Sequence, residues 1–258
     1  MAGYVNVTAM QKGGVGKTTF TFNLGKGLAS RGNRVLFIDN DPQGDLTQAC
    51  SGDITIPAES NTMRLYESGS KIEPLAISEN LNLIGTDIEL ALAQEKNFEV
   101  IFDFADKISE LVNEFDFILI DSLPSFGIMH TAALLAADTL CIPTKAAPFS
   151  LKAIKMLMET VQKVKRPRMN PDLKILGIII NHAEGSQTSL GKEIERQLRD
   201  FYQDLVFNNK INRTVKIEES PAFRESIMEY MPESKAAEQF ELIIDEFLKK
   251  YQDIMECK

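Results

Sequence analysis

The sequence predicts an α/β protein with a doubly wound, mostly parallel sheet and helices on both faces of that sheet. Three observations lead to this fold class. Short apolar segments of strand length alternate with longer segments of helical periodicity, which favours parallel strands joined by right-handed crossovers. The apolar segment at 34–39 shows little alternation, as expected of a strand covered on both faces. The chain has 258 residues and no repeat, linker or low-complexity tract, so a single domain over residues 1–258 is expected.

The expected elements follow in chain order. Strands are expected at 4–9, 34–39, 81–85, 115–121, 139–143 and 173–181. Helices are expected at 20–30, 126–136, 150–164, 189–202 and 235–251, with further helical spacing over 87–114 that breaks near Asn97. The polar segment 51–74 is expected to be a surface excursion with one short helix at 63–67. Ligands of such sheets bind at the carboxyl ends of the strands, so the loops there are the place to look for a site.

The segment between the first strand and the first helix predicts a phosphate-binding loop. It reads Gln11-Lys12-Gly13-Gly14-Val15-Gly16-Lys17-Thr18-Thr19. Glycines let the backbone approach an anion closely, and the helix that follows offers unpaired N–H groups and the positive end of its dipole. At this spacing Lys17 reaches the β- and γ-phosphates, and the Thr18 hydroxyl sits on Mg²⁺. The other residues expected to enclose the phosphates are Gly13, Gly14, Val15, Gly16 and Thr19. The sequence therefore predicts a P-loop NTPase, and the alternative is a glycine turn that binds nothing.

Acidic residues lie at or just beyond the carboxyl ends of two expected strands. Asp39 and Asp41 follow the strand at 34–39, and Asp121 ends the strand at 115–121. Parallel strands bring these ends to the edge where the phosphate loop lies, so the three carboxylates are expected to gather around a Mg²⁺ and its waters. Acids at strand ends also cap helices and form turns, so this interpretation depends on the loop beside them.

A second lysine, Lys12, and a glutamine at Gln11 make the loop depart from the general G-x-x-x-x-G-K-[ST] pattern. In this form it resembles the deviant Walker A loop of the ParA/MinD family of ATPases. The segment from Asp39 to Gly44 is similar to the first switch of that family, and Ile118-Leu119-Ile120-Asp121 is similar to its Walker B strand. The second switch matches only in part, since Leu123 stands where the family usually has a proline.

The resemblance implies roles for individual residues. Lys12 would reach the phosphates of a nucleotide held by the partner subunit, so the active form would be a homodimer with ATP between the subunits. Asp39 would support the Mg²⁺ shell, together with Thr18 and Asp121 as the metal site. Asp41 would position the attacking water for in-line phosphoryl transfer, with Lys12 and Lys17 as the other catalytic residues.

Two features of the C-terminal half extend the resemblance. Asn181, at the end of the strand at 173–181, stands where the family commonly places an asparagine that contacts adenine, and a strand-end cap is the alternative. Residues 212–221 resemble the partition ATPases in particular, except that Asn212 replaces their proline.

Two basic clusters could contact nucleic acid, and either could instead be a solvated face. The cluster that the resemblance favours as DNA-binding consists of Arg213, Lys216, Arg224 and Lys235. The other consists of Lys163, Lys165, Arg166 and Arg168. The net charge of the chain is −9, so DNA contact must come from such a local patch, should be salt-sensitive, and should involve the backbone without sequence preference.

The leading interpretation is a ParA-type ATPase that dimerises on ATP and binds nucleoid DNA non-specifically. With a ParB-like or cargo-adaptor protein that stimulates hydrolysis, it would partition or position a plasmid, a chromosome or a protein cargo. One alternative is a MinD-like ATPase at a membrane surface, which requires a basic amphipathic tail. The tail at 247–258 is only weakly amphipathic, so no membrane contact is expected.

Three further alternatives remain on the same fold, and the sequence also indicates a cellular location. A metal-cluster carrier would need paired cysteines, whereas Cys50, Cys141 and Cys257 are scattered, and a metabolic enzyme would need a second substrate site that the sequence does not identify. A regulator that binds nucleotide without turnover is opposed by Asp41 and Lys12. The cysteine pattern, the lack of a secretion signal and the lack of a bilayer-length apolar run favour the cytoplasm.

Overall fold

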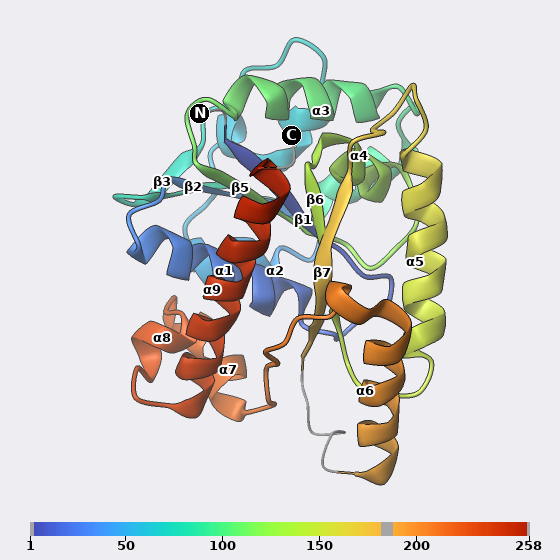
Figure 1. The fold of residues 1–258 in the computed structure, drawn as a ribbon. Coiled ribbons are helices and arrows are strands. Elements are labelled where there is room, and N and C mark those ends of the chain that lie inside the picture. Colours follow the sequence, from blue (N-terminus) through green and yellow to red (C-terminus); the bar gives the residue numbers. More distant parts are fainter. Residues whose placement is uncertain (1–2, 182–187, 257–258) are drawn as a thin grey trace.

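Seven strands form one sheet in the computed structural model, which describes residues 3–181 and 188–256 (Figure 1). The strand order is β3-β4-β2-β5-β1-β6-β7, and every neighbouring pair is parallel except β3 with β4. The strands are β1 (Tyr4–Thr8), β2 (Val35–Asn40), β3 (Leu75–Ser78), β4 (Leu81–Ile84), β5 (Phe117–Ser122), β6 (Thr139–Thr144) and β7 (Lys174–Ile180). The predicted fold class is confirmed.

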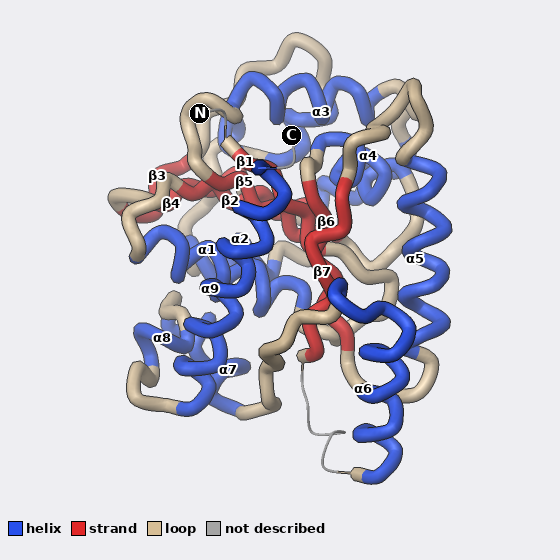
Figure 2. The backbone as a smooth tube through the Cα atoms, viewed as in Figure 1, coloured by secondary structure: helices blue, strands red, loops and turns tan. Residues whose placement is uncertain are grey.

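Helices cover both faces of this sheet (Figure 2). The α-helices are α1 (Lys17–Ser30), α2 (Asp45–Ser51), α3 (Val100–Leu111), α4 (Ile128–Ala136), α5 (Ser150–Val164), α6 (Ser189–Tyr202), α7 (Val215–Glu219), α8 (Ile227–Tyr230) and α9 (Lys235–Glu256). Short 3₁₀-helices are η1 (Ala58–Ser60), η2 (Thr62–Tyr66), η3 (Ile88–Glu95), η5 (Gln203–Leu205) and η6 (Ser220–Phe223). None of the helices in the described part of the chain combines the length and apolar character needed to cross a membrane.

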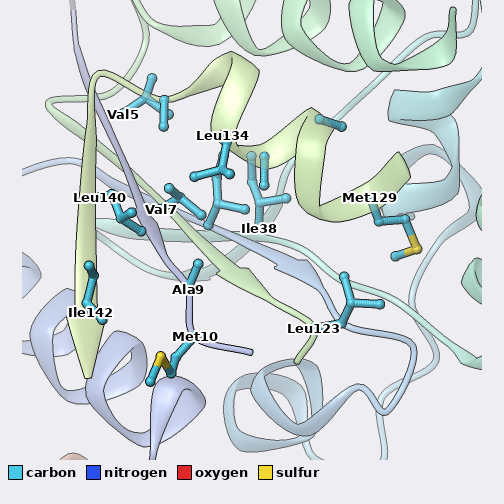
Figure 3. Packing of buried hydrophobic residues seen from close by; sticks show 14 of the residues in the cluster. Val5, Val7, Ala9, Met10, Ile38, Leu123, Met129, Leu134, Leu140 and Ile142 are labelled. Carbon is cyan, nitrogen blue, oxygen red and sulfur yellow. The ribbon is translucent and has the colours of Figure 1, made fainter. Parts of the chain in front are cut away.

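The sheet separates two hydrophobic cores. Val5 and Val7 of β1 face the core under α3, α4, α5 and α6, and Figure 3 shows them packed near Leu134 of α4. Tyr4 of the same strand and Phe117 of β5 face the core under α1 and α9. Successive side chains of a strand point to opposite faces, so β1 and β5 are buried on both faces, and β5 reads as a continuous apolar run from Phe117 to Ile120.

The segment 51–74 corrects one expectation. It was predicted to be a surface excursion, but the side chains of Thr62 and Tyr66 in η2 are buried. The Thr62 hydroxyl donates to the carbonyl of Asp39 at 2.8 Å, and the Tyr66 hydroxyl donates to Oδ1 of Asn40 at 2.7 Å. These bonds attach the segment to the carboxyl end of β2, so it helps to hold the residues that follow this strand.

Two smaller expectations have clear outcomes. The helical spacing over 87–114 forms η3 and α3 as separate elements, with the break near Asn97 as predicted. Cys50 and Cys141 are buried free thiols, and Cys257 lies outside the described residues.

Helix α4 contains a buried histidine that should make the protein sensitive to acid. His130 is 1% exposed, and neither ring nitrogen has a hydrogen-bond partner among the described residues. Burial, with a smaller contribution from the charge of Lys17, lowers the pKa of His130 to about 4. Between about pH 6.5, the ordinary pKa of histidine, and pH 4, the unfolded chain binds a proton that the folded protein does not. The free energy of unfolding therefore decreases as the pH is lowered through this window.

We expect His130→Leu to reduce this acid sensitivity. Between pH 7.5 and 5.5 the wild-type free energy of unfolding should fall by about 1 kcal/mol more than that of the variant. Denaturant titrations of both proteins at the two pH values measure this difference. Parallel pH profiles would contradict the assignment of the proton to His130.

Candidate nucleotide-binding site

The carboxyl ends of β2, β5 and β1 lie level at one edge of the sheet. Thr8 of β1 is opposite Asp121 of β5, and Asp121 is opposite Asp39 of β2. The loops that follow these strands therefore share one edge, as the parallel order requires. The structure places the phosphate loop, both switch segments and the predicted acids there.

The phosphate loop is open toward solvent. Helix α1 begins at Lys17, three residues earlier than expected, so Lys17, Thr18 and Thr19 lie in its first turn. Gly14 and Gly16 have φ values of 67° and 84°, a left-handed backbone that favours glycine. A Cβ placed on Gly14 would meet no atom within 4 Å. The N–H groups from residue 13 to residue 19 donate no hydrogen bond to another described residue. The loop therefore presents free donors at a helix N-terminus, which fits a phosphate group.

Lys17, Thr18 and Asp121 form the polar centre of the site. The Thr18 hydroxyl donates to Oδ2 of Asp121 at 2.6 Å, whereas Oδ1 of Asp121 is buried and has no partner among the described residues. Burial raises the pKa of Asp121 well above its usual range, an effect that the nearby Asp39 charge strengthens and the Thr18 bond and the Lys17 ammonium oppose. Burial likewise lowers the pKa of Lys17, which is 7% exposed. A hydroxyl beside an unpaired carboxylate oxygen is a donor set that suits a hydrated Mg²⁺.

Asp39 lies at the predicted edge, and both of its carboxylate oxygens accept hydrogen bonds within the protein. Its Oδ2 accepts from the backbone N–H of Thr47 at 2.8 Å and from the Thr47 hydroxyl at 2.7 Å, and its Oδ1 accepts from the N–H of Asp41 at 3.3 Å. Burial raises the pKa of Asp39 to about 7 in spite of these bonds. No group of three acidic, histidine or cysteine side chains able to hold a metal is present in residues 3–181 and 188–256. Asp39 thus has partners of its own in Thr47 and at the start of α2, and the gathering of Asp39, Asp41 and Asp121 around a hydrated Mg²⁺ stays a prediction.

Asp41 lies at the rim of the site. Its carboxylate is half-buried and accepts from the N–H of Gln43 at 3.1 Å. Burial raises the pKa of Asp41, and the charge of Lys17 lowers it. Asp41 is thus less enclosed than Asp39, which is fully buried, and it lies close enough to Lys17 to feel its charge.

Lys12 is held by a neighbouring loop. Its Nζ donates to the carbonyl of Pro148, in the loop between β6 and α5, at 3.3 Å. The two lysines of the loop therefore have different environments. Lys17 lies buried beside Asp121, whereas Lys12 is hydrogen-bonded to the loop that follows β6.

Asn181 braces the phosphate loop from the β7 side. It is 3% exposed, and its Nδ2 donates to the carbonyl of Val15 at 2.9 Å. The sequence indicated Asn181 as an adenine contact or a strand-end cap. The positioning role seen here joins segments 166 residues apart, which no local pattern reveals. The adenine contact itself stays a prediction.

A cavity of about 800 Å³ opens beside the first turn of α1, a volume typical of small-molecule sites. It is lined by Thr18, Thr19 and Phe22 of α1, by residues of α2 and the turn after it, and by Pro221, Ala222 and Arg224. The Arg224 side chain reaches across to α2, because a Cβ on Gly52 would lie 3.5 Å from its Cδ. The contribution of α2 and η6 to this edge was not predicted.

The second switch departs from the family pattern at Leu123 without leaving a gap. Leu123 is 8% exposed and belongs to the core under α4 (Figure 3). The Ser122 hydroxyl donates to the carbonyl of Thr8 at 3.0 Å. An apolar contact thus replaces a proline here, and the loop remains attached to β1.

The basic cluster favoured for DNA lies at one corner, formed by α7, η6, α8 and the start of α9 (Figure 1). Arg213 pairs with Glu218 at 3.2 Å and Lys216 pairs with Glu219 at 2.8 Å. Arg224 and Lys235 are exposed. The structure therefore brings the four residues together, but glutamates reduce the positive charge of two of them.

Comparison with known proteins identifies a matching family model, related sequences and similar solved structures. A family model described as an AAA domain matches residues 5–175. The chain is 32% identical over 253 residues to the chromosome-partitioning ATPase Soj of Thermus thermophilus, covering 95% of each chain. A structure of a McdA variant from Cyanothece in complex with ATP is 26% identical, with a TM-score of 0.82 and coverage of 96% and 97%. Cobyrinic acid a,c-diamide synthase of Mycobacterium smegmatis, solved with ADP and magnesium, is 27% identical with a TM-score of 0.73, covering 88% of this chain and 91% of its own.

Proposed function

Since the chain belongs to the family of ParA-type partition ATPases, we propose that it binds ATP with Mg²⁺ at the phosphate loop and uses the hydrolysis cycle to position a cargo. The cargo class is a plasmid, a chromosome or a protein assembly. The observation that carries this proposal is the different placement of the two loop lysines. Lys17 lies buried beside Asp121, whereas Lys12 is only half-buried and its Nζ donates to the carbonyl of Pro148 in the neighbouring loop. In our proposal Lys12 is the lysine that turns toward another subunit.

The residues of the edge divide the chemistry among them. The loop N–H groups and Lys17 hold the phosphates, and Asp41 orients the attacking water. Thr18 and Asp121 would hold Mg²⁺, which neutralises phosphate charge when bound. Asp39, through Thr47, fixes the start of α2 and so sets the position of Asp41. Catalysis here consists of positioning and charge stabilisation, and no covalent intermediate is needed.

The active form we propose is a homodimer with ATP between the subunits, in which Lys12 contacts the nucleotide of its partner. A second cation at the γ-phosphate stabilises the charge that develops in transfer, as arginine fingers do. A ParB-like or cargo-adaptor protein would stimulate hydrolysis and end each cycle.

The surface on which this dimer acts is, in our proposal, nucleoid DNA in the cytoplasm. The end of α9 supports this choice over a membrane. Tyr251 packs against Tyr4 with ring centroids 4.4 Å apart and against Phe117 at 5.3 Å, and Ile254 and Met255 pack on the same core. The apolar face of this helix is thus occupied by the sheet, whereas a membrane-targeting helix must offer that face to lipid. Residues 257 and 258 of the tail lie outside the described residues.

We expect Lys216→Ala combined with Arg224→Ala to weaken DNA binding by the ATP-bound protein. Each lost phosphate contact should reduce the slope of log K against log salt by about 0.9, so the pair should reduce it by about 2. The measurement is binding to random-sequence duplex DNA with ATP, with ADP and without nucleotide across a salt series. The matched control is Arg166→Ala with Arg168→Ala, at the exposed end of α5.

The same series tests the proposal as a whole. Binding only with ATP, with a steep salt dependence, is the expected result for the unaltered protein. Equal losses from both double variants would show that the corner at α7 to α9 is not the DNA surface. Absence of DNA binding in every nucleotide state would assign the function to another surface.

A further inference from the structure

Two exposed phenylalanines flank the phosphate loop at the nucleotide-binding edge. Phe149, in the loop after β6, is 78% exposed, and Phe126, in the loop after β5, is 51% exposed. β5, β1 and β6 are consecutive in the sheet, so the loops that follow them are neighbours, and the one carrying Lys12 is in the middle (Figure 1). A large apolar ring facing water at a ligand-binding edge indicates a contact surface.

The backbone at Phe149 has a costly conformation. Its φ is 68° and its ψ is 0°, in the left-handed region that residues with a Cβ rarely adopt. Only three described residues other than glycine have positive φ, and Phe149 is the only aromatic one among them. The loop maintains this conformation, since the Ser150 hydroxyl donates to the carbonyl of Lys145 at 2.6 Å and the Ala153 N–H donates to the carbonyl of Phe149 at 3.0 Å. Such outliers persist where the surrounding structure imposes them, and they concentrate at functional contacts.

The strained residue is also connected to Lys12. The carbonyl that accepts from Lys12 Nζ at 3.3 Å belongs to Pro148, the residue directly before Phe149. A contact that fixes the Phe149 ring would therefore also fix the Pro148 carbonyl, and through it the direction of the Lys12 side chain.

We propose that Phe149 is an anchor through which a second copy of this chain binds at the nucleotide edge, and that this contact sets the position of Lys12 through Pro148. The inference deepens the proposed function and rests on its homodimer. It adds a residue that determines assembly, at a position for which the sequence analysis assigned no role.

Self-association fits this edge better than other partners do. In a dimer with a two-fold axis, the same surface of both copies meets, so each Phe149 ring would contact the nucleotide-binding edge of the other copy. That edge carries both signs of charge, with Lys12 on one loop and Asp41 and Asp45 on another, so the axis can oppose basic and acidic groups. The same acids disfavour DNA. Buried aromatic rings are common energetic centres of protein interfaces.

The test is sedimentation of the full chain with Mg²⁺ and a non-hydrolysable ATP analogue. We expect Phe149→Ala to raise the dimer dissociation constant at least about tenfold, while analogue binding by the monomer stays within about twofold. The matched control is Phe201→Ala, which removes a ring that is 74% exposed at the far end of α6 and should leave dimerisation unchanged. Phe149→Gly, which also relieves the left-handed backbone, should lose dimerisation as Phe149→Ala does and unfold at no lower temperature.

Each outcome decides the inference. If Phe149→Ala dimerises as the unaltered protein does, the inference is overturned and the proposed homodimer stays intact. The same holds if that variant dimerises normally but loses DNA binding. Equal weakening by Phe201→Ala also overturns it, because the effect would not be local. If the unaltered protein stays monomeric with the analogue, the homodimer fails and the inference fails with it.

Discussion

Replacing Lys17 with alanine is expected to abolish ATP binding. Lys17 is 7% exposed and lies beside Asp121 in the first turn of α1, where the phosphates are expected to lie. Charge-assisted hydrogen bonds contribute about 1.5–3 kcal/mol each, and the buried Asp121 loses its nearby cation as well. We therefore expect affinity for ATP with Mg²⁺ to fall at least about 100-fold in calorimetric titration.

The control for this variant is Lys163→Ala, on the exposed surface near the end of α5, which should bind ATP normally. Thermal unfolding without nucleotide shows whether the Lys17→Ala protein is folded. A folded Lys17→Ala protein that binds ATP with wild-type affinity would contradict the site.

Replacing Asp41 with alanine is expected to give a different defect. ATP binding and dimerisation should persist, because Lys17, Thr18 and the loop N–H groups are untouched. Turnover should fall by about 10²-fold or more, the range typical of a lost proton-accepting or water-orienting group. Steady-state phosphate release, with ATP binding measured in parallel, separates the two properties.

Asp45→Ala is the matched control for Asp41. Asp45 is an exposed carboxylate at the start of α2, and its charge also acts on Lys17. If turnover depends only on negative charge near Lys17, both variants should lose it to a similar degree. If Asp41 orients the water, Asp45→Ala should retain most of its activity. Normal turnover in Asp41→Ala would refute the role assigned to it.

The parts of this fold that the sequence predicts are those with strong local signals. The strand expected at 34–39 is Val35–Asn40, and the one expected at 115–121 is Phe117–Ser122, because both are apolar runs buried on both faces. The edge strand β3 was not predicted, since its four residues are half-exposed and lack such a run. Helices α2, α7 and α8 are shorter than isolated helices that are stable in water, so tertiary packing decides their existence.

The residues of the site likewise fall into those that local sequence signals predict and those that they do not. The phosphate loop and the acids after β2 and β5 were identifiable because their spacing in the chain is itself the signal. The bonds from Asp39 to Thr47 and from Asn181 to Val15 depend on an unpredicted helix and on a contact across the sheet. Roles defined by what a side chain touches at long range are therefore the ones that sequence reasoning missed.

The buried carboxamide of Asn40 joins the carboxyl end of β2 to η2 and to α4. It accepts from the Tyr66 hydroxyl at 2.7 Å and donates to the carbonyl of Met129, in the first turn of α4, at 3.0 Å. Moving the segment after β2 away from α4 would leave buried polar groups unsatisfied, at about 1–3 kcal/mol for each group. A displacement of α4 would therefore also act on the end of β2 that leads into the first switch. A ligand that favours one arrangement of α4 would then change the affinity for nucleotide by the same factor by which nucleotide changes the affinity for that ligand. A regulator acting on the α4 side need not touch the nucleotide to control it.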